Sequence, residues 1–357
     1  MTKKNATPLA GVKEIARLAG VSIATVDRVI HKREGVSAKT KKKIEAIIGK
    51  LNYQPNILAQ RLALASRGTI RLAVLLPNIS QETEFWMAPL EGIRQAQGEI
   101  KRYNVHVENY FFDQNDQQSF VKQMKALAKY KTDGILFTPT FPEESLQFIE
   151  SLEKAECPYV LINCDIPGHD SLGYIGPDIL HSGYLAGQLL HYCIKGGEKI
   201  LIVNISGEID NNSAILRKEE GFRRYFKENG LENELLSFNT TQTDYSSVSR
   251  KLDALLKKQK GVEAIFVTNS RVSVLARYLE KAGLNDMLLL GYDFVKDNVT
   301  YLKKGVIDFL ICEKPQEQGY RGIMTLFQHL VFSSPIEKKY LMPIDIITKE
   351  NCQFYRN

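Results

Sequence analysis

The chain has 357 residues, of which 44% are hydrophobic and 25% are charged. This composition is that of a folded globular protein and excludes disordered, collagen-like and coiled-coil chains. At about 150 residues per domain, the length predicts two or three domains. The apolar runs are shorter than the roughly 20 residues of a membrane helix, so no membrane association is expected.

The N-terminal segment and the cysteines indicate a cytoplasmic protein. Residues 1–13 contain lysines but no apolar block of the kind found in a secretory signal. An odd number of widely spaced cysteines, without a Cys-x-x-Cys pair, favours reduced thiols over disulfides or a zinc site. These are Cys157, Cys164, Cys193, Cys312 and Cys352. The six histidines show no metal-ligand spacing either, so we expect neither a metal nor a cofactor.

The charge is unevenly distributed along the chain. Residues 1–68 carry fourteen basic and four acidic side chains, a net charge of +10, whereas the remaining residues have a net charge of −4. A basic head on a slightly acidic body suggests a polyanionic partner for the head. The alternative, a solvated charged tail, is less consistent with the regular apolar pattern of this segment.

The basic segment predicts three short helices. Val12, Ile15 and Ala19 lie on one helical face, and Gly20 suits the turn that follows. Ser22 and Ser37 are predicted N-caps of a second and a third helix. Helix, glycine turn, helix and supporting helix form the helix-turn-helix plan, in which the start of the second helix enters the major groove of DNA.

Residues 12–56 resemble the DNA-binding head of the lactose repressor (LacI/GalR) family through the segments "VKEIARLAGVSIATVDRVIH", "VSAKTKKKIEAI" and "LNYQPN". Together with the helix-turn-helix plan, the resemblance implies a set of DNA-contacting residues in the head. These are Ser22, Ile23, Ala24, Thr25, Asp27, Arg28, His31, Ser37 and Thr40. Asp27 stands where the family often has serine. Three alternatives are open for its carboxylate: it would repel the DNA phosphates, accept a hydrogen bond from a cytosine amino group, or hold Arg28 in place.

The resemblance continues into the segment "NILAQRLAL" at residues 56–64. It implies a hinge helix that orders on operator DNA and pairs across a dimer, with Asn56 and Ala59 close to the DNA and Leu62 as an apolar wedge in the minor groove. The alternative is that Leu58 and Leu62 pack on the protein core.

From Ile70 onward, apolar runs alternate with amphipathic segments such as Asp116–Tyr130 and Asp244–Lys258. The runs expected to form strands are 71–77, 105–112, 134–138, 159–163, 200–205, 264–268 and 287–291. This alternation predicts parallel sheets covered by helices, and the length predicts two lobes. Ligands of such sheets bind beyond the carboxyl ends of the strands.

Polar and aromatic residues follow these runs, as a carbohydrate cleft requires. The candidate effector-binding residues are Asn78, Trp86, Thr138, Asn163, Arg217, Tyr245, Asn269, Asp293 and Glu313. Each could instead be a helix cap or a core polar group. Segments such as "SAILRKEEGF", "VTNSRV" and "GYDF" resemble the sugar-binding core of the same family. That resemblance implies contacts with the effector by Arg217, Asn269 and Asp293, and stacking by Tyr245. Asn163 replaces a usual aspartate and Glu313 a usual glutamine.

Catalytic motifs are poorly represented. The segment Gly196–Lys199 precedes a predicted strand, whereas a phosphate-binding loop follows one. Asp293 and Glu313 could form an acid–base pair, but a sugar-binding protein uses the same residues as acceptors. We therefore do not expect an enzyme.

The expected fold class is α/β: a three-helix helix-turn-helix head, a hinge helix, and a two-lobed core of parallel sheets that resembles a periplasmic binding protein. The expected domains are the head (1–55), hinge helix and linker (56–68) and effector-binding core (69–357). Lobe one is expected at about 69–175 and 308–337, and lobe two at about 176–307 and 338–357.

The predicted function is that of a DNA-binding transcriptional regulator that acts as a repressor and is controlled by a carbohydrate-like effector. The expected partners are a near-palindromic operator and a second copy of the chain, because two heads on two half-sites require two-fold symmetry. The last apolar run, Tyr340–Ile347, is expected to form a single strand, and the ten residues after it are too few for a tetramerising coiled coil. Alternatives are a regulator with a nucleobase or sugar phosphate corepressor, a solute-binding protein for transport and a sugar-converting enzyme.

Overall fold

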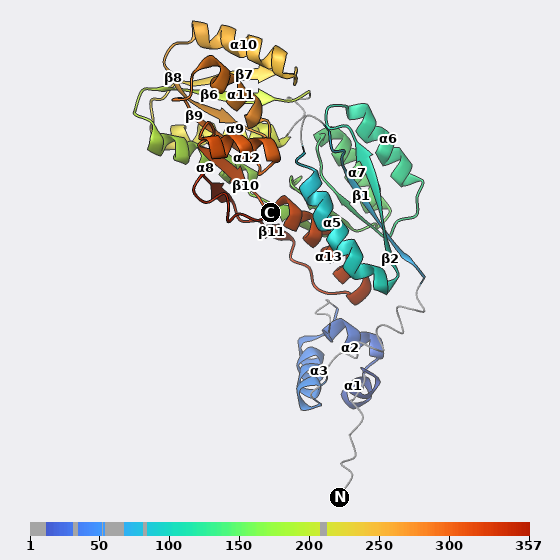
Figure 1. Cartoon of the computed structure of the whole chain (residues 1–357). Helices are drawn as coiled ribbons and strands as arrows, with labels where there is room; N and C mark the ends of the chain where they lie inside the picture. The colour runs from blue at the N-terminus through green and yellow to red at the C-terminus, as the bar shows by residue number, and fades with distance from the viewer. Residues whose placement is uncertain (1–11, 31–34, 52, 54–67, 81–83, 208–212) are drawn as a thin grey trace, which may run out of the picture.

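The computed structural model describes residues 12–30, 35–51, 53, 68–80, 84–207 and 213–357 (Figure 1). The expected hinge helix lies outside the described residues, as do His31, Asn56, Ala59 and Leu62. Within the described residues, no helix is both long and apolar enough to span a bilayer.

The head consists of three helices, as the sequence predicts: α1 (Val12–Ala19), α2 (Ile23–Ile30) and α3 (Ala38–Lys50). Each contributes one fully buried side chain, Ile15, Val26 and Ile44, to a small common core. The turn between α1 and α2 needs a left-handed residue, and Gly20 provides it with φ of 70°.

The first sheet of the core has six parallel strands in the order β11-β5-β4-β3-β1-β2. Its strands are β1 (Ile70–Pro77), β2 (Val105–Phe112), β3 (Gly134–Phe137), β4 (Tyr159–Ile162), β5 (Gly173–Gly176) and β11 (Lys339–Leu341). Both faces are covered by helices, which explains why all four residues of β3 and of β4 are buried.

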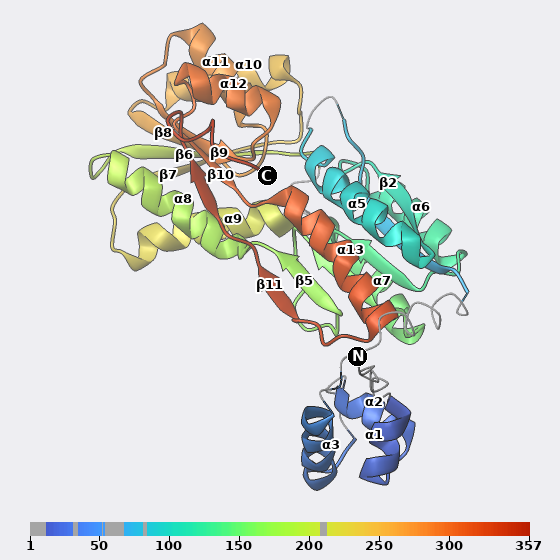
Figure 2. The same cartoon turned by 60° about the horizontal axis from the view of Figure 1, so that its bottom comes forward.

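Two helices pack on each face of the first sheet. Those on one face are α5 (Met87–Ile100), which continues into the 3-10 turn Lys101–Tyr103, and α13 (Pro315–Phe332). Those on the other face are α6 (Gln117–Ala128) and α7 (Pro142–Lys154). We call this sheet with its four helices lobe one. Figure 2 shows α5 and α13 lying side by side, although more than 200 residues separate them.

The second sheet also has six strands, in the order β12-β10-β9-β8-β6-β7. Its strands are β6 (Lys199–Ile205), β7 (Leu235–Thr240), β8 (Val262–Val267), β9 (Leu288–Tyr292), β10 (Phe309–Cys312) and β12 (Asp345–Ile347). All pairs are parallel except β10 with β12, which is antiparallel.

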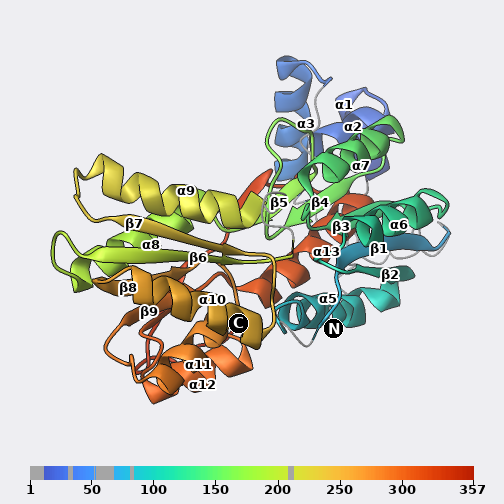
Figure 3. The same ribbon diagram turned by 90° about the horizontal axis from the view of Figure 1, so that it is seen from above.

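Five helices cover the second sheet, as the view from above makes clear (Figure 3). On one face lie α8 (Ile179–Cys193) and α9 (Ser213–Glu228). On the other face lie α10 (Tyr245–Lys258), α11 (Val272–Ala282) and α12 (Lys296–Lys304). We call this sheet with its five helices lobe two.

The chain crosses between the lobes three times within the described residues: after β5, after β10 and between β11 and β12. The expected lobe boundaries were wrong at the last two crossings. Residues 309–312 form β10 in the second sheet, and residues 339–341 form β11 in the first. The run Tyr340–Ile347, expected to be a single strand, therefore splits into two strands in different sheets. Local hydrophobicity does not reveal which sheet edge a short strand joins.

Candidate functional site

The start of α2 in the head exposes a row of side chains to solvent. The Ser22 hydroxyl caps the helix by accepting from the Thr25 backbone N–H at 3.1 Å, as predicted. The two hydroxyl groups also lie 2.9 Å apart. Beyond them Ile23, Ala24 and Arg28 are exposed, whereas Val26 and Val29 face the core of the head. An isoleucine 49% exposed at a helix start is available for an apolar contact.

Helix α3 presents a similar cap and a basic surface. The Ser37 hydroxyl accepts from the Thr40 backbone N–H at 3.2 Å. Lys39, Lys41 and Lys42 are exposed, and the Lys43 ammonium donates to the Ala19 carbonyl at 2.8 Å, at the end of α1. A helix C-terminus favours such a cation because its last carbonyls lack partners inside the helix.

Asp27 is half-buried on α2. Its carboxylate lies near Tyr53, and burial together with this charge raises the pKa of the Tyr53 hydroxyl. The remaining candidate of the head, His31, lies outside the described residues.

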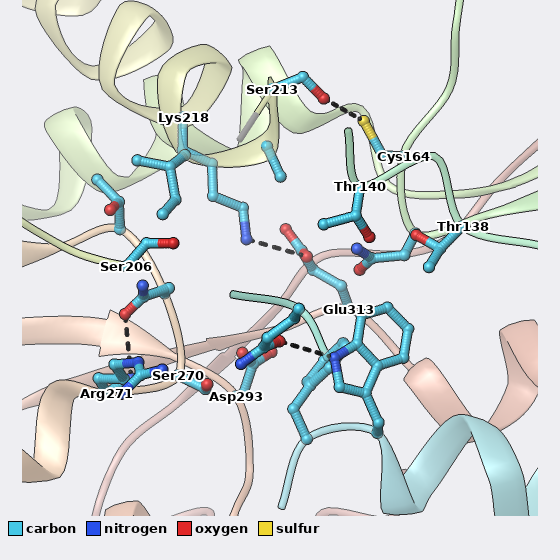
Figure 4. A pocket seen from close by; sticks show the side chains of 18 of the residues that line it. Thr138, Thr140, Cys164, Ser206, Ser213, Lys218, Ser270, Arg271, Asp293 and Glu313 are labelled. Carbon is cyan, nitrogen blue, oxygen red and sulfur yellow. Dashed lines mark hydrogen bonds and ion pairs between the residues drawn. The ribbon is translucent and has the colours of Figure 1, made fainter. Parts of the chain in front are cut away.

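A cleft of about 800 Å³ lies between the two lobes, beyond the carboxyl ends of the strands (Figure 4). Lobe one contributes mainly aromatic and neutral polar side chains to its wall. They include Phe85, Trp86, Gln114, Thr138, Thr140 and Asn163. Lobe two, with the crossing after β10, contributes the ionisable groups Lys218, Arg271, Asp293 and Glu313, together with Ser206, Asn269 and Ser270.

A buried ion pair forms the floor of the cleft. The Lys218 ammonium lies 3.4 Å from the Glu313 carboxylate, with side-chain exposures of 10% and 5%, and 3.5 Å from the centre of the Tyr292 ring. Glu313 also accepts from the Ser182 hydroxyl at 2.5 Å. A second partner is needed because a buried charge is unfavourable unless its oxygens are hydrogen-bonded.

Gly183 on α8 allows Lys218 to reach this position. A Cβ at residue 183 would lie 1.9 Å from the Lys218 carbonyl oxygen, so only glycine lets α8 and α9 approach this closely. Figure 4 shows the Lys218 side chain extending from α9 towards Glu313.

Asp293 follows β9 in a left-handed conformation, with φ of 75°. Its backbone is anchored, because its N–H donates to the Ile311 carbonyl at 2.9 Å and its carbonyl accepts from the Asn298 side chain at 3.1 Å. The residue is only 8% exposed, and its carboxylate has no hydrogen-bond partner among the described residues. Burial raises the pKa of this carboxyl to about 7, a shift opposed by the Lys218 charge and assisted by Glu313.

The opposite wall is aromatic. The Trp86 indole is 6% exposed and donates to the Gln114 side chain at 3.1 Å, which fixes the orientation of the ring. Phe85 packs against it edge-to-face, with ring centroids 4.9 Å apart. An apolar face opposite hydrogen-bonding groups suits a ligand with one apolar and one hydroxylated side.

Gln318 on α13 joins residues from both sides of the cleft. It is 1% exposed, accepts from the Asn163 backbone N–H at 2.9 Å and donates to the Glu313 carbonyl at 2.7 Å. Asn163, like Asp293, has a left-handed backbone, with φ of 67°. On the lobe-two side, the Asn269 side-chain amide donates a hydrogen bond to the Ile205 carbonyl at 2.7 Å, which holds this side chain in place.

Six of the nine predicted effector-binding residues line the cleft together: Trp86, Thr138, Asn163, Asn269, Asp293 and Glu313. The other three predicted residues, Asn78, Arg217 and Tyr245, do not line the cleft.

Each of the three has another environment. Asn78 is exposed at the end of β1. Arg217 pairs with Asp165 at 2.5 Å. Tyr245 packs on the core of lobe two, with the Arg277 guanidinium 4.1 Å from the centre of its ring.

Sequence reasoning missed Lys218, the neighbour of Arg217. Ile215, Lys218 and Phe222 are buried on α9 and recur at helical spacing, whereas Arg217 lies off that face. This periodicity was the signal that could have selected the lysine. Gln114, Ser206 and Arg271 carried no comparable signal, because loop and turn residues lack a periodic pattern.

No group of three or more His, Cys, Asp or Glu side chains suited to a metal ion occurs in the described part of the chain. The molecule thus combines a helix-turn-helix head with a two-lobed domain whose interlobe cleft is built for a small polar ligand.

Comparisons with known proteins agree with this architecture. Residues 11–56 match the family model "Bacterial regulatory proteins, lacI family", and residues 72–333 match "Periplasmic binding protein domain". The chain therefore belongs to the lacI family of bacterial regulatory proteins, whose members are DNA-binding transcriptional regulators.

Individual relatives span most of the chain. Catabolite control protein A of Priestia megaterium is 28% identical over 79% of this chain and 82% of its own. The ribose operon repressor of Escherichia coli K12 is 28% identical over 81% of this chain and 84% of its own. Among solved structures, a proposed LacI transcriptional regulator from Bacteroides fragilis is 31% identical, with a TM-score of 0.76, over 81% of this chain and all of its own.

Proposed function

We propose that this regulator represses transcription from an operator and that a small carbohydrate bound in the interlobe cleft controls its operator affinity. One observation carries the assignment of the effector: the buried Asp293 carboxylate, which has no hydrogen-bond partner among the described residues, lines the same cleft as the Trp86 indole. Sugar hydroxyls would satisfy the carboxylate, while the apolar face of the ring would lie on the indole.

The other polar groups of the cleft would act as acceptors and donors around the ring. Glu313 and Asp293 accept from hydroxyl groups, and the amides of Asn163 and Asn269 donate or accept. Neither carboxylate is assigned a catalytic role, because both are suited to binding hydroxyl groups without reaction.

On the DNA side, we propose a homodimer whose two heads read the half-sites of a near-palindromic operator in the cytoplasm. The exposed start of α2 supports contacts by Ser22, Ile23 and Arg28 in the major groove. Asn56, Ala59 and Leu62 would belong to the hinge helix, with Leu62 as the wedge in the minor groove.

The two sites would be coupled through the position of the lobes. A ligand that binds one arrangement of the lobes more tightly shifts the molecule towards it. Because the head precedes β1 of lobe one, a change in the lobes would alter the distance between the paired hinge segments. Effector binding and operator binding would then affect each other equally.

A nucleobase or sugar phosphate corepressor is the second candidate effector. The edge-to-face pair of Phe85 and Trp86 favours it, since a planar base could stack on an aromatic ring, and Lys218 and Arg271 could attract phosphate. A transport protein is less well supported, because the helix-turn-helix head has no role in transport.

A thermal-shift screen of the full chain with sugars, sugar acids, sugar phosphates and nucleobases tests the proposal. A ligand of the native state raises the melting temperature with increasing concentration. Hits are then added to a mobility-shift titration with operator DNA. We expect a carbohydrate to change operator affinity at least fivefold. A response to nucleobases alone would favour the second candidate, and the absence of any response would contradict both.

A further inference from the structure

The crossing after β10 is the place where the effector cleft meets a helix of lobe one. Glu313 lines the cleft at this crossing, Lys314 follows it, and α13 begins at Pro315. The other two crossings, at residues 177–178 and 342–344, contribute no residue to the lining of the cleft. Among the three crossings in the described part of the chain, this one alone could therefore respond directly to a bound effector.

Both residues of this crossing are tied to lobe two. The Glu313 carboxylate bonds the Lys218 ammonium and the Ser182 hydroxyl, and the Lys314 ammonium lies 3.1 Å from the Asp345 carboxylate on β12. Lys314 also has a left-handed backbone, with φ of 53°, which is unfavourable for a residue with a Cβ. Such a conformation persists only where surrounding contacts hold it, so Lys314 is a candidate hinge between the lobes.

Gln318, in the first turn of α13, spans this hinge from the side of lobe one. Its side-chain amide donates to the Glu313 carbonyl at 2.7 Å, and its side-chain oxygen accepts from the Asn163 backbone N–H at 2.9 Å. Asn163 and Glu313 line the cleft, whereas Gln318 lies behind them and is 1% exposed. Without the amide, a rotation at Lys314 could move the Glu313 peptide and leave α13 in place. With the amide, the peptide and the start of the helix have to move together.

Two glycines fix α13 to α5. A Cβ at Gly319 would lie 2.1 Å from the Pro89 carbonyl oxygen, and a Cβ at Gly92 would lie 1.9 Å from the Gln316 carbonyl oxygen. The two helix backbones are thus in contact, and Figure 2 shows the helices side by side. Because close-packed surfaces transmit strain, a displacement of α13 is passed on to α5. Both helices pack on the sheet of lobe one, whose strand β1 follows the head.

We propose that Gln318 is the positioning residue that couples the effector cleft to operator binding. An effector hydroxyl that bonds the Glu313 carboxylate draws it away from its partners in lobe two, and the Glu313 peptide shifts. The Gln318 amide transfers this shift to α13, and α13 transfers it to α5 and the rest of lobe one. This inference rests on the proposed function, since it names the residue through which the effector site acts on the head.

A double-mutant cycle on the full chain tests the proposal without an identified effector. Glu313→Gln removes the charge that pairs with Lys218 and thereby loosens the crossing from lobe two. Its effect on DNA affinity is measured by mobility shift at fixed salt, with a duplex that the wild-type chain selects from a random library. We expect at least a fivefold change in the wild-type background and less than a twofold change in Gln318→Met, whose side chain has a similar length but no amide.

Gln328→Met makes the same change at an exposed position of α13 and should retain the fivefold effect of Glu313→Gln. An equal effect in the wild-type and Gln318→Met backgrounds would overturn the proposal, as would the absence of any effect in the wild type. A residue that only stabilises the fold would lower the melting temperature and leave the effect of Glu313→Gln unchanged. If Gln318→Met does not fold, Gln318→Asn is used with the same expectation, because its shorter side chain cannot reach both partners.

Monosaccharides that raise the melting temperature in the thermal-shift screen supply a second readout. They should bind Gln318→Met within fivefold of wild type, because the Glu313 carboxylate keeps its partners in lobe two and the Asn163 N–H keeps a contact with the Ile175 carbonyl at 3.3 Å. Their effect on DNA affinity should fall below twofold in this variant, and a full effect would overturn the proposal. If no sugar binds, the carbohydrate effector is contradicted, while the double-mutant cycle still decides the role of Gln318.

Discussion

The Arg217 guanidinium on α9 of lobe two lies 2.5 Å from the Asp165 carboxylate, which follows β4 of lobe one. The side chains are 29% and 15% exposed, so water screens this ion pair less than a pair on the open surface. Lys339 approaches the other carboxylate oxygen at 3.7 Å. Arg217, which the sequence assigned to the effector, therefore links the lobes beside the cleft.

The first prediction concerns this link. Arg217→Ala should destabilise the closed arrangement of the lobes by about 1–2 kcal/mol, the range between exposed ion pairs and charge-assisted hydrogen bonds. A ligand that binds the closed lobes then has to supply this free energy, so effector affinity should fall about tenfold. Small-angle scattering without ligand should show a larger radius of gyration.

Arg224→Ala is the matched control, since Arg224 lies on the same helix and pairs with Glu228 on the exposed surface. It should change neither the affinity nor the radius of gyration. Equal behaviour of the two variants would show that the Arg217–Asp165 pair does not hold the lobes together.

The second prediction concerns pH. The Asp293 carboxyl has an ordinary pKa of 3.8 and a pKa of about 7 in the folded protein, chiefly because it is buried. Between these pH values the folded state retains a proton that the unfolded state has released, so this group lowers stability as the pH rises from about 4 to 7. At pH 8 without effector, Asp293→Asn should be more stable than wild type, by on the order of 3 kcal/mol if the full shift applies.

Urea unfolding at pH 4.5 and pH 8 measures this difference. The gain in stability should be small at pH 4.5, where the wild-type carboxyl is protonated when folded. Asp297→Asn, which makes the same change at an exposed position on α12, is the surface control. A gain in stability of the same size at both pH values would contradict the raised pKa of the Asp293 carboxyl.

The third prediction concerns the buried pair of Lys218 and Glu313. Lys218→Met leaves the Glu313 carboxylate buried without its cation, and such a change costs about 3–5 kcal/mol. The double variant Lys218→Met/Glu313→Gln removes both charges and should recover most of this stability. Both proteins should lose the thermal shift produced by the effector. A loss below about 1 kcal/mol in the single variant would mean that the pair is already solvated.

The fourth prediction concerns the head. Arg28→Ala should reduce operator affinity by about 1–3 kcal/mol if its guanidinium contacts a base edge or a phosphate, without affecting effector binding. Arg17→Ala is the control, because Arg17 forms an exposed pair with Glu14 on α1. Mobility-shift titration at fixed salt compares the two. Unchanged affinity in Arg28→Ala would contradict the position of α2 in the major groove.

The fifth prediction tests the hinge segment, which lies outside the described residues. Leu62→Ala should lose specific operator affinity but keep the weak, salt-sensitive binding to random DNA, because only the apolar wedge is removed. Titration with operator and random duplexes measures both affinities. An equal decrease on the two duplexes would identify Leu62 as a packing residue.

Local sequence patterns located the head helices and many of the core strands of this protein. Ser22 and Ser37 cap helices where the sequence predicts them, and each of the seven apolar runs forms a strand. Caps and periodicity depend on residues within a turn or two of each other, so they are readable without the fold. The same pattern predicts that residues directly after parallel strands lie together, and it located Asn163, Asn269 and Asp293 in the lining of the cleft.

The tertiary structure alone decided the relations between distant segments. The Gln318 side chain accepts a hydrogen bond from the backbone N–H of Asn163, 155 residues earlier in the chain. The short strands at 309–312 and 339–341 each belong to the lobe opposite to the one that the sequence predicts. Lys218 enters the cleft, whereas Arg217 turns to Asp165, because the packing of α9 against α8 sets the rotation of the helix. The periodicity of α9 indicates which of its faces is buried, but the partners that this face meets are set by contacts between surfaces far apart in the chain.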